Sequence, residues 1–287
     1  MGVTLKQCPP GRGFLFGCSG HCGIFLLMKI ITLNTWGGRA GKENLLAFLK
    51  SHAGTTDVFC LQEIWMYPHG KLGGRLAGGV ILDYSRIMIN GVKEIAEQLP
   101  YFNTFFRPSI DDNYGLLALV RKNINVVHEG DVFVYKEKGY VSDKDVGNHA
   151  RNLQHITLKT ERGLITVINF HGLWTDKPEG KGKQDIPERI EQSEKIVQYT
   201  QTLGNPFVLC GDFNLLPTTE SVKILERGGM RNLVVENSIA STRTSHYLKP
   251  EKFADYIFVS KDLMVKDFKV LSDEVSDHAA LVVEVDF

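Results

Sequence analysis

The feature that most constrains the fold is a series of ten short runs rich in β-branched and aromatic residues. Runs of this length and composition are typical of β-strands. Ten strands exceed what one small sheet commonly holds, so we expect two β-sheets packed face to face. The predicted strands cover residues 30–34, 57–62, 116–122, 131–135, 153–158, 164–170, 206–212, 255–260, 265–271 and 280–285.

Four segments in which apolar residues keep a helical spacing separate these strands. The first predicted helix, residues 42–52, places Leu45, Leu46, Phe48 and Leu49 on one face. The other predicted helices cover residues 91–99, 186–202 and 219–227. No linker, internal repeat or low-complexity stretch interrupts this alternation, so we expect a single α/β domain that spans residues 28–287.

Residues 1–27 differ from the rest of the chain, because they are rich in Gly and hold three of the five cysteines. We expect an unstructured extension or a mis-assigned start, with the folded domain beginning at Met28. The apolar run over residues 13–27 is too short and too polar to cross a membrane. It also lacks a cleavage site for a signal peptide. Cys18, His21 and Cys22 have no second pair of ligands at zinc-finger spacing, so we expect no metal there.

The other two cysteines, Cys60 in VFCLQ and Cys210 in VLCGD, lie inside apolar runs. Cysteine in such surroundings behaves as a small hydrophobic residue, so we expect two buried thiols. A chain of this size with an odd number of cysteines does not need a disulfide framework. We therefore expect a cytoplasmic protein. Secretion or membrane association through residues 1–27 is the alternative.

Positive and negative charges balance in this chain, with 33 Lys and Arg against 33 Asp and Glu. Neutrality argues against the long, salt-sensitive contact that strongly basic proteins make with nucleic acid. Basic residues nevertheless gather in two long loops, 64–80 and 136–151, and after His171. They are Lys71, Arg75, Lys144, Arg151, Lys177, Lys181 and Lys183. They either hold phosphates near a binding site or are solvated charges, since acidic residues lie among them. These acidic residues are Asp143, Asp145, Asp176 and Glu179.

Polar side chains follow or precede several predicted strands at the point where each strand ends. They are Asn34, Gln62, Glu63, His171, Asp212, Asn214, Asp255, Asp277 and His278. Groups at one set of strand ends can converge on a single site. The set supplies hard oxygen ligands, two imidazoles, and a carboxylate with an amide in one tight turn. Phosphoester hydrolysis needs these groups: ligands for a divalent cation, a base for water, and donors to the phosphate.

Six short motifs occur in a characteristic order: LNTW, LQE, INFHG, GDFN, ADYIFVS and SDH. In this order and at these separations the chain resembles the endonuclease/exonuclease/phosphatase superfamily over about residues 28 to 287. The resemblance implies a four-layered α/β sandwich with two packed, mixed β-sheets. It also implies a hydrolase that uses Mg²⁺, or Mn²⁺, to cleave a phosphoester by in-line attack of water.

The resemblance implies roles for eight residues. Glu63 is the principal metal carboxylate, while Asn34 and Asp277 help to hold the metal or lie beside it. Five further residues are implied to be catalytic: His278, Asp255, Asp212, Asn214 and His171. Among these, Asp255 orients His278, which contacts the phosphate or activates water. Asp212 positions the water, Asn214 donates to a phosphate oxygen, and His171 is an acid for the leaving oxygen or a donor.

One position departs from the pattern of apurinic endonucleases, which carry an acidic residue where this chain has Trp36. The LNTW form is more similar to the sphingomyelinase-like and broad phosphodiesterase branches. We expect Trp36 to be a core aromatic at the end of the first strand, with contact to substrate as the alternative. An exposed apolar hairpin for lipid contact has one weak candidate, WMYP at residues 65–68.

The substrate stays open at this point. A phosphodiester is expected, with a nuclease acting on DNA or RNA and a sphingomyelinase-like or inositol-phosphate phosphoesterase as alternatives. A catalytically inactive module that binds nucleic acid or protein is the alternative from another class. We expect a phosphoester substrate as the partner, no obligate protein partner and no transmembrane segment.

Overall fold

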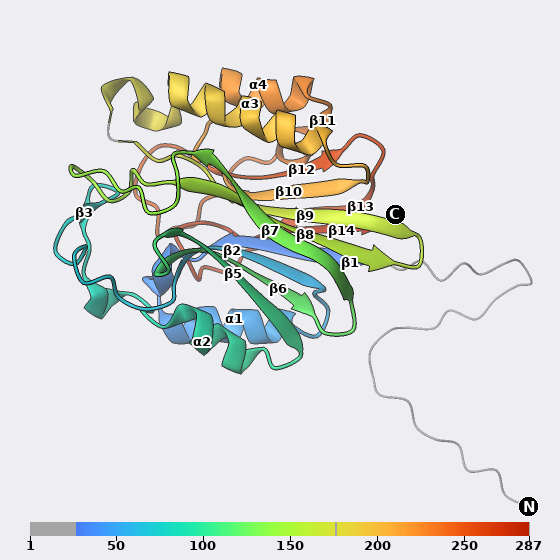
Figure 1. The fold of residues 1–287 in the computed structure, drawn as a ribbon, viewed down its shortest axis with the longest axis horizontal. Helices are drawn as coiled ribbons and strands as arrows, with labels where there is room; N and C mark the ends of the chain where they lie inside the picture. The colour runs from blue at the N-terminus through green and yellow to red at the C-terminus, as the bar shows by residue number, and fades with distance from the viewer. Residues whose placement is uncertain (1–26, 176, 287) are drawn as a thin grey trace, which may run out of the picture.

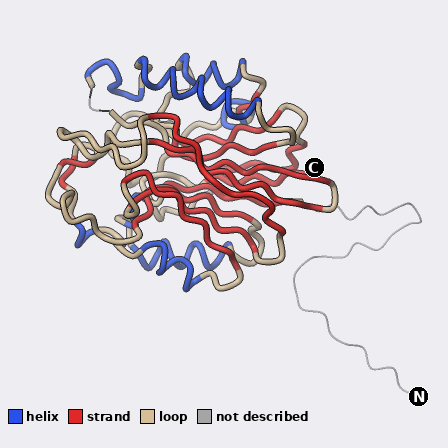
Figure 2. Tube along the Cα trace, viewed as in Figure 1, coloured by secondary structure: helices blue, strands red, loops and turns tan. Residues whose placement is uncertain are grey.

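The chain forms four layers, in which two β-sheets pack face to face and each carries helices on its outer side (Figures 1 and 2). The computed structural model describes residues 27–175 and 177–286. The extension expected at residues 1–27, with Cys18, His21 and Cys22, lies outside the described residues apart from Leu27. Among the described helices, none is long and apolar enough to cross a membrane. The two packed sheets with helices on their outer sides confirm the predicted four-layered α/β sandwich.

The first sheet has six strands and is covered by α1 (Lys42–His52) and α2 (Gly91–Gln98). In spatial order its strands are β13 (Met264–Val270), β14 (Leu281–Asp286), β1 (Met28–Asn34), β2 (Val58–Trp65), β6 (Tyr114–Arg121) and β5 (Phe102–Ile110). Leu45, Phe48 and Leu49 of α1 are buried against it, while Leu46 is only partly buried.

The second sheet also has six strands and is covered by α3 (Pro187–Gln201) and α4 (Glu220–Arg227). In spatial order its strands are β11 (Met230–Asn232), β12 (Asp255–Ser260), β10 (Phe207–Asp212), β9 (Gly163–His171), β8 (Arg151–Thr160) and β7 (Asn125–Tyr135). The short helix α5 (Leu233–Glu236) comes directly after β11. A two-stranded hairpin, β3 (Leu76–Ala77) and β4 (Val80–Ile81), stands apart from both sheets.

All ten predicted strands and all four predicted helices occur in the structure, with ends shifted by a few residues. Sequence reasoning missed β5, because Pro108 and a run of half-buried residues obscure the alternation expected of a strand. Pro lacks a backbone N–H and is tolerated in edge strands. The position of β5 at the edge of its sheet therefore accounts for Pro108.

The space between the sheets is filled mainly by apolar side chains, but a small polar network crosses it. Asn169 of β9 donates to Gln154 Oε1 at 3.0 Å and to the Leu61 carbonyl at 3.1 Å. Gln62 of β2 donates to Asn169 Oδ1 at 2.7 Å. Buried amides are stable only when paired, so this network fixes the register in which the two sheets dock.

Cys60 and Cys210 also lie in this interior and are buried free thiols, as predicted. The pKa of the Cys60 thiol is well above its ordinary value because of its hydrogen bond with Cys210 and its burial. A thiol held protonated is a poor nucleophile, so Cys60 behaves as a core residue.

Candidate active site

The site lies at one edge of the sandwich, where the pair of parallel strands that each sheet contains comes to its end. In the first sheet, β1 and β2 run parallel and place Asn34 beside Gln62. In the second, β9 and β10 run parallel and place His171 beside Asp212. Strand β12 runs antiparallel to β10, so its first residue, Asp255, lies opposite Asp212. Polar ends of strands from both sheets therefore meet at the same edge, as the sequence predicted.

Glu63 reaches this edge through an irregularity in β2. The pairing of β2 with β6 shifts between Leu61 and Ile64, and Glu63 has a left-handed backbone with φ of 60°. A bulge of this kind re-aims a side chain relative to its neighbours. The side chain of Gln62 points between the sheets to Asn169, whereas that of Glu63 lines a cavity at the edge of the sandwich.

The GDFN motif forms a tight turn after β10. Gly211 has φ of 140°, and a Cβ atom added there would lie 1.9 Å from the Phe170 carbonyl oxygen of the neighbouring strand. Only glycine fits this approach. Asn214 has φ of 55°, and its backbone N–H donates to Asp212 Oδ1 at 2.8 Å. The turn thereby fixes the Asp212 carboxylate and brings the Asn214 side chain to the same cavity.

Asn34 joins the two halves of the site. Its Nδ2 donates to Glu63 Oε1 at 3.1 Å and to Asp212 Oδ2 at 2.9 Å. Its Oδ1 accepts from the Trp36 backbone N–H at 3.0 Å, which fixes the amide orientation. Because Asn34 and Asp212 belong to different sheets, this contact holds the two carboxylates at a fixed separation.

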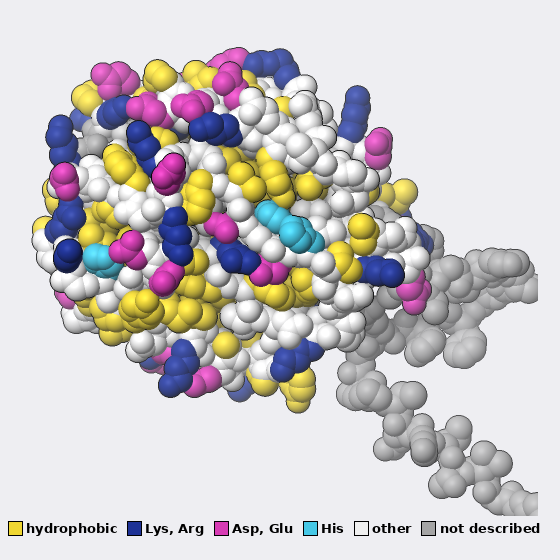
Figure 3. All heavy atoms as spheres, in the orientation of Figure 1, with side chains coloured by type: hydrophobic (Ala, Val, Ile, Leu, Met, Phe, Trp, Pro, Cys, Tyr) yellow, Lys and Arg dark blue, Asp and Glu magenta, His cyan; other side chains and the backbone are white. Residues whose placement is uncertain are grey.

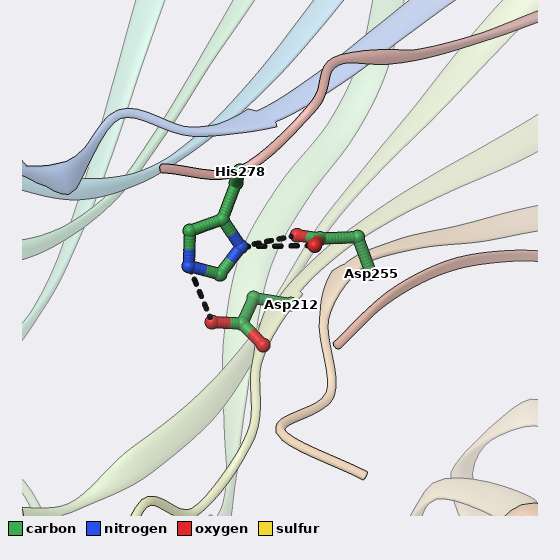
Figure 4. A group of neighbouring side chains, drawn as sticks. All are labelled: Asp212, Asp255 and His278. Atoms are coloured by element: carbon green, nitrogen blue, oxygen red, sulfur yellow. Dashed lines mark hydrogen bonds and ion pairs between the residues drawn. The ribbon is translucent and has the colours of Figure 1, made fainter. Parts of the chain in front are cut away.

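His278 lies between Asp212 and Asp255 (Figure 4). Both Asp255 oxygens lie 2.9 Å from His278 Nδ1, so the proton on Nδ1 is donated to Asp255. His278 Nε2 is 3.6 Å from Asp212 Oδ2. A buried carboxylate that binds one ring nitrogen fixes the tautomer and aims the other nitrogen at its target. Here that target is the space beside Asp212.

The two imidazoles of the site differ in protonation. Burial and the Arg151 charge hold the pKa of His171 well below its ordinary value. Burial and the Arg243 charge also oppose protonation of His278, but three carboxylates, with Asp255 first, raise the pKa of His278. Burial alone would raise the pKa of Asp212, but nearby cations, with His278 first, lower it. At neutral pH, His171 is therefore neutral, while the surroundings of His278 favour its protonated form beside an ionised Asp212.

The expected metal ligands suit a divalent cation. Asp277 Oδ1 is buried and accepts no hydrogen bond from any residue between 27 and 286 that the structure describes. Burial raises the pKa of Glu63. The nearby Arg39 lowers it, and the negative charge of Asp277 raises it further. A buried carboxylate oxygen that has no hydrogen-bond donor is available to a hard cation, and Mg²⁺ and Mn²⁺ both prefer oxygen ligands. Glu63, Asp277 and the Asn34 amide therefore fit such an ion.

Three other side chains could offer ligand atoms to a metal ion, namely Asp212, Asp255 and His278. These atoms lie within 4.8 Å of one another. In this group the nitrogen and oxygen atoms of His278 and Asp255 already bind each other. The arrangement is that of a hydrogen-bonded pair, which agrees with the roles expected from the sequence.

Six of the predicted site residues line a cavity of about 400 Å³, namely Glu63, His171, Asp212, Asn214, Asp277 and His278. Its wall includes two arginines, a histidine and a tyrosine that sequence reasoning did not place there: Arg39, Arg243, His246 and Tyr247. Arg243 Nη1 lies 3.2 Å from Asp277 Oδ2, and its guanidinium stacks 4.0 Å from the Tyr247 ring centroid. The signal for Arg243 is weak in the sequence, because STRTSHY shows no strand or helix pattern.

Trp36 lines the same cavity and is half-buried, so the expectation of a core aromatic was wrong. The chain leaves β1 and turns through a left-handed backbone at Trp36, with φ of 51°. This turn takes the ring out of the sheet layer and places it beside Arg39, whose guanidinium carbon lies 6.0 Å from the ring centroid.

The basic residues of the long loops divide into two groups. Arg151 and Lys183 are buried in the cavity wall, whereas Lys177 is exposed and pairs with Glu188. Asp145 is buried and accepts from the backbone N–H groups of residues 78, 79 and 147, which ties the two long loops together. Over the face in Figure 3, positive and negative side chains are interspersed. Neither interpretation of the loop charges therefore holds for all of them.

The segment at residues 65–68 does not form an apolar hairpin. Trp65 is the last residue of β2 and is buried, and Tyr67 is exposed. The exposed apolar residues near the cavity are instead Val80 in the hairpin of β3 and β4 and Leu248.

Two parallel strand pairs in facing sheets, with a His–Asp pair and metal-binding oxygens at their ends, define the class of deoxyribonuclease-like sandwich proteins. The family model for the endonuclease/exonuclease/phosphatase family matches residues 31–278. The chain belongs to this family, whose members are phosphoesterases and nucleases.

Solved structures share the fold. A mannosyl-6-phosphatase from Bacteroides thetaiotaomicron is 19% identical, with 91% of this chain and 100% of that chain covered and a TM-score of 0.66. A family protein from Leptotrichia buccalis is 22% identical with the same coverage and TM-score. TDP2 from D. rerio, in complex with a single-strand DNA product, is 16% identical, covers 91% and 100%, and has a TM-score of 0.65. Among curated proteins, no sequence matches this chain.

Proposed function

We propose that this protein is a metal-dependent hydrolase that cleaves a small or locally bound phosphoester. The observation that carries the proposal is the buried Asp277 oxygen without a hydrogen-bond partner among the described residues, next to Glu63, in the cavity that also contains His278 and Asp212. A buried carboxylate oxygen without a hydrogen-bond donor, beside oriented imidazoles, is a costly arrangement in a folded protein unless function requires it.

In this proposal Glu63, Asp277 and Asn34 hold the cation. When bound, Mg²⁺ supplies positive charge to the phosphate as the leaving oxygen departs. Asp212 is ionised and orients the attacking water, and Asn214 donates to a nonbridging oxygen of the phosphate. The hydrolysis adds water to phosphorus, breaks one P–O ester bond, and transfers a proton to the leaving oxygen.

The two histidines divide the remaining work. His278 is held by Asp255 and directs Nε2 toward the phosphate, where a cationic imidazole donates a hydrogen bond. His171 is neutral and lies 3.6 Å from Asp212, so it can donate to the phosphate or exchange a proton with water. This assignment rests on the positions of the side chains around one cavity.

The cations inside the cavity favour a compact substrate. Arg39, Arg151 and Arg243 surround the proposed phosphate position, whereas Lys and Arg on the face in Figure 3 alternate with acidic residues. A long basic track for duplex DNA is therefore not supported by that face. A lipid phosphoester is a second candidate, because Val80 and Leu248 are exposed beside the cavity.

The free thiols of Cys60 and Cys210 support a reducing, cytoplasmic location.

The test is a turnover screen with Mg²⁺ and with Mn²⁺. Substrates are single-stranded and duplex DNA, RNA, abasic DNA, sphingomyelin, inositol phosphates and sugar phosphates. Wild-type protein should hydrolyse at least one of them, and Glu63→Ala, Asp212→Ala and His278→Ala should lose turnover while remaining folded. Normal activity in any of the three variants would overturn the assignment of the site. If every substrate fails, the chain is a binding module.

A further inference from the structure

We infer that a second anion-binding subsite, built around Lys183, adjoins the proposed catalytic cavity and receives a second phosphate group of the substrate. This inference rests on the proposed function, because it extends the same site.

The subsite is a cavity of about 480 Å³ beside the first one. Five residues line both cavities, so the two are contiguous: Trp174, Lys183, Asn214, Tyr247 and Lys249. Lys183 Nζ lies 3.4 Å from Asn214 Oδ1. A substrate whose scissile phosphate contacts Asn214 therefore extends directly past Lys183 into the second cavity.

Lys183 is an unusual residue to bury. Its side chain is 9% exposed, and across residues 27–175 and 177–286 no ion pair links it to a carboxylate. Buried lysines normally have an acidic partner, because an isolated charge loses its hydration on burial. The Arg243 charge is close enough to oppose its protonation, while the ring contact, a cation–π contact at 5.8 Å between Nζ and the Tyr247 ring centroid, is favourable.

The charges of the second cavity are not balanced. Four basic residues line it, namely Lys181, Lys183, Arg189 and Lys249, against two carboxylates, Asp145 and Glu251, which leaves an excess of two positive charges when all four are protonated. Both carboxylates are already engaged. Asp145 accepts three backbone N–H groups, and Glu251 accepts the Tyr247 hydroxyl at 3.1 Å.

Of these cations, Arg189 is occupied by backbone carbonyls. Among the described residues, Lys181, Lys183 and Lys249 have no ion-pair partner. A phosphate dianion balances an excess of two positive charges and accepts charge-assisted hydrogen bonds from lysine ammonium groups. The structure thus favours a substrate with two phosphate groups over one with a single phosphodiester.

The experiment compares matched substrates that differ by one phosphate. The dinucleotides TpT and pTpT serve if the enzyme cleaves diesters, and glucose 6-phosphate and glucose 1,6-bisphosphate serve if it cleaves monoesters. We expect Lys183→Met to raise KM for the bisphosphorylated member roughly 10- to 100-fold with little change in kcat, because charged hydrogen bonds have about this effect. The singly phosphorylated member should lose clearly less, its loss being confined to the effect of removing the Lys183 contact with Asn214. Lys183→Arg should retain most of the discrimination, and Lys223→Met, an exposed lysine of α4, is the control.

Equal losses on both members would place Lys183 at the scissile phosphate and overturn the inference. A second measurement does not depend on turnover. Inorganic phosphate, titrated in EDTA, should change the fluorescence of Trp174 in wild-type protein, and Lys183→Met should weaken that binding at least 10-fold. Loss of the fluorescence change in Trp174→Phe would show that the change comes from Trp174. If phosphate binds equally to wild type and Lys183→Met, the subsite is wrong even when the hydrolase is active. If phosphate binding depends on Lys183 but no phosphoester is hydrolysed, only the proposed function fails.

Discussion

Replacing Lys183 with methionine should make the protein more stable, although it removes a residue from the proposed binding surface. Burial and the Arg243 charge lower the pKa of Lys183 from 10.5 to about 7 in the folded protein. The charges that face it and favour protonation are the carboxylates of Asp212, Asp255 and Asp277. They only partly offset the loss of hydration, so the charged lysine opposes folding.

The size of the effect can be worked from the two pKa values. The interval between 10.5 and about 7 corresponds to roughly 5 kcal/mol when the lysine is fully charged. Methionine also forfeits the hydrogen bond to Asn214, which contributes about 1 kcal/mol. The variant is therefore expected to gain up to about 4 kcal/mol at pH 6.

The direction of the pKa shift determines how the stability of the wild-type protein changes with pH. Because the folded pKa is below the unfolded pKa, the unfolded state binds more protons between about pH 7 and 10.5, and wild-type stability rises with pH over this window. Below about pH 7 the cost is constant. The advantage of Lys183→Met should therefore fall by roughly 2.5 kcal/mol between pH 6 and pH 9.

Urea unfolding of both proteins in EDTA at pH 6, 7.5 and 9 measures this difference. Taking the difference between the two proteins cancels the contributions of other groups that titrate. A variant that is less stable than wild type at pH 6, or stability curves that stay parallel from pH 6 to 9, would refute the reasoning. Lys223→Met should show no pH-dependent difference, because Lys223 is exposed.

Four other outcomes are expected. Asp255→Asn should lower kcat about 10²- to 10⁴-fold with little change in KM, because His278 loses the carboxylate that orients it. A small effect on kcat in steady-state kinetics would contradict the role of Asp255 in orienting His278. Gly211→Ala should cost about 3 kcal/mol or more, since the new Cβ meets a backbone carbonyl at 1.9 Å; unchanged urea unfolding would show that the turn can relax. Asn169→Leu should cost roughly 2 to 4 kcal/mol by leaving several buried groups without partners, again by urea unfolding. Deleting residues 1–27 should leave the melting temperature and turnover nearly unchanged, and a large loss of either would show that this segment belongs to the fold.

Sequence patterns predicted the elements well because most strands are bounded by clear changes in polarity. The run LITVINF, for example, is apolar until His171, and the structure ends β9 at that residue. Patterns could not identify β5, where Pro108 and half-buried positions conceal the strand. They also could not show that Gln62 and Glu63, neighbours in sequence, point to different places. That difference depends on a bulge in the pairing of β2 with β6.

The candidate site was predictable where side chains lie at strand ends and unpredictable where they come from loops. Asn34, Asp212 and Asp255 lie at strand ends, so topology alone brings them together. Arg243 and Lys183 come from irregular segments, and their positions depend on packing against Tyr247 that no local pattern encodes. Burial of Lys183 is a tertiary property, because the same residue in an isolated loop is a solvated charge.

The hydrogen bond between Asn34 and Asp212 joins residues that are 178 positions apart and belong to different sheets. Neither sheet by itself contains both carboxylates that flank this amide. During synthesis, the early strands therefore leave the ribosome without a working site, and the chemistry begins only when the sheets have docked. Turnover can thus serve as a reporter of complete folding, and a variant that loosens the docking of the sheets should lose activity before it loses secondary structure.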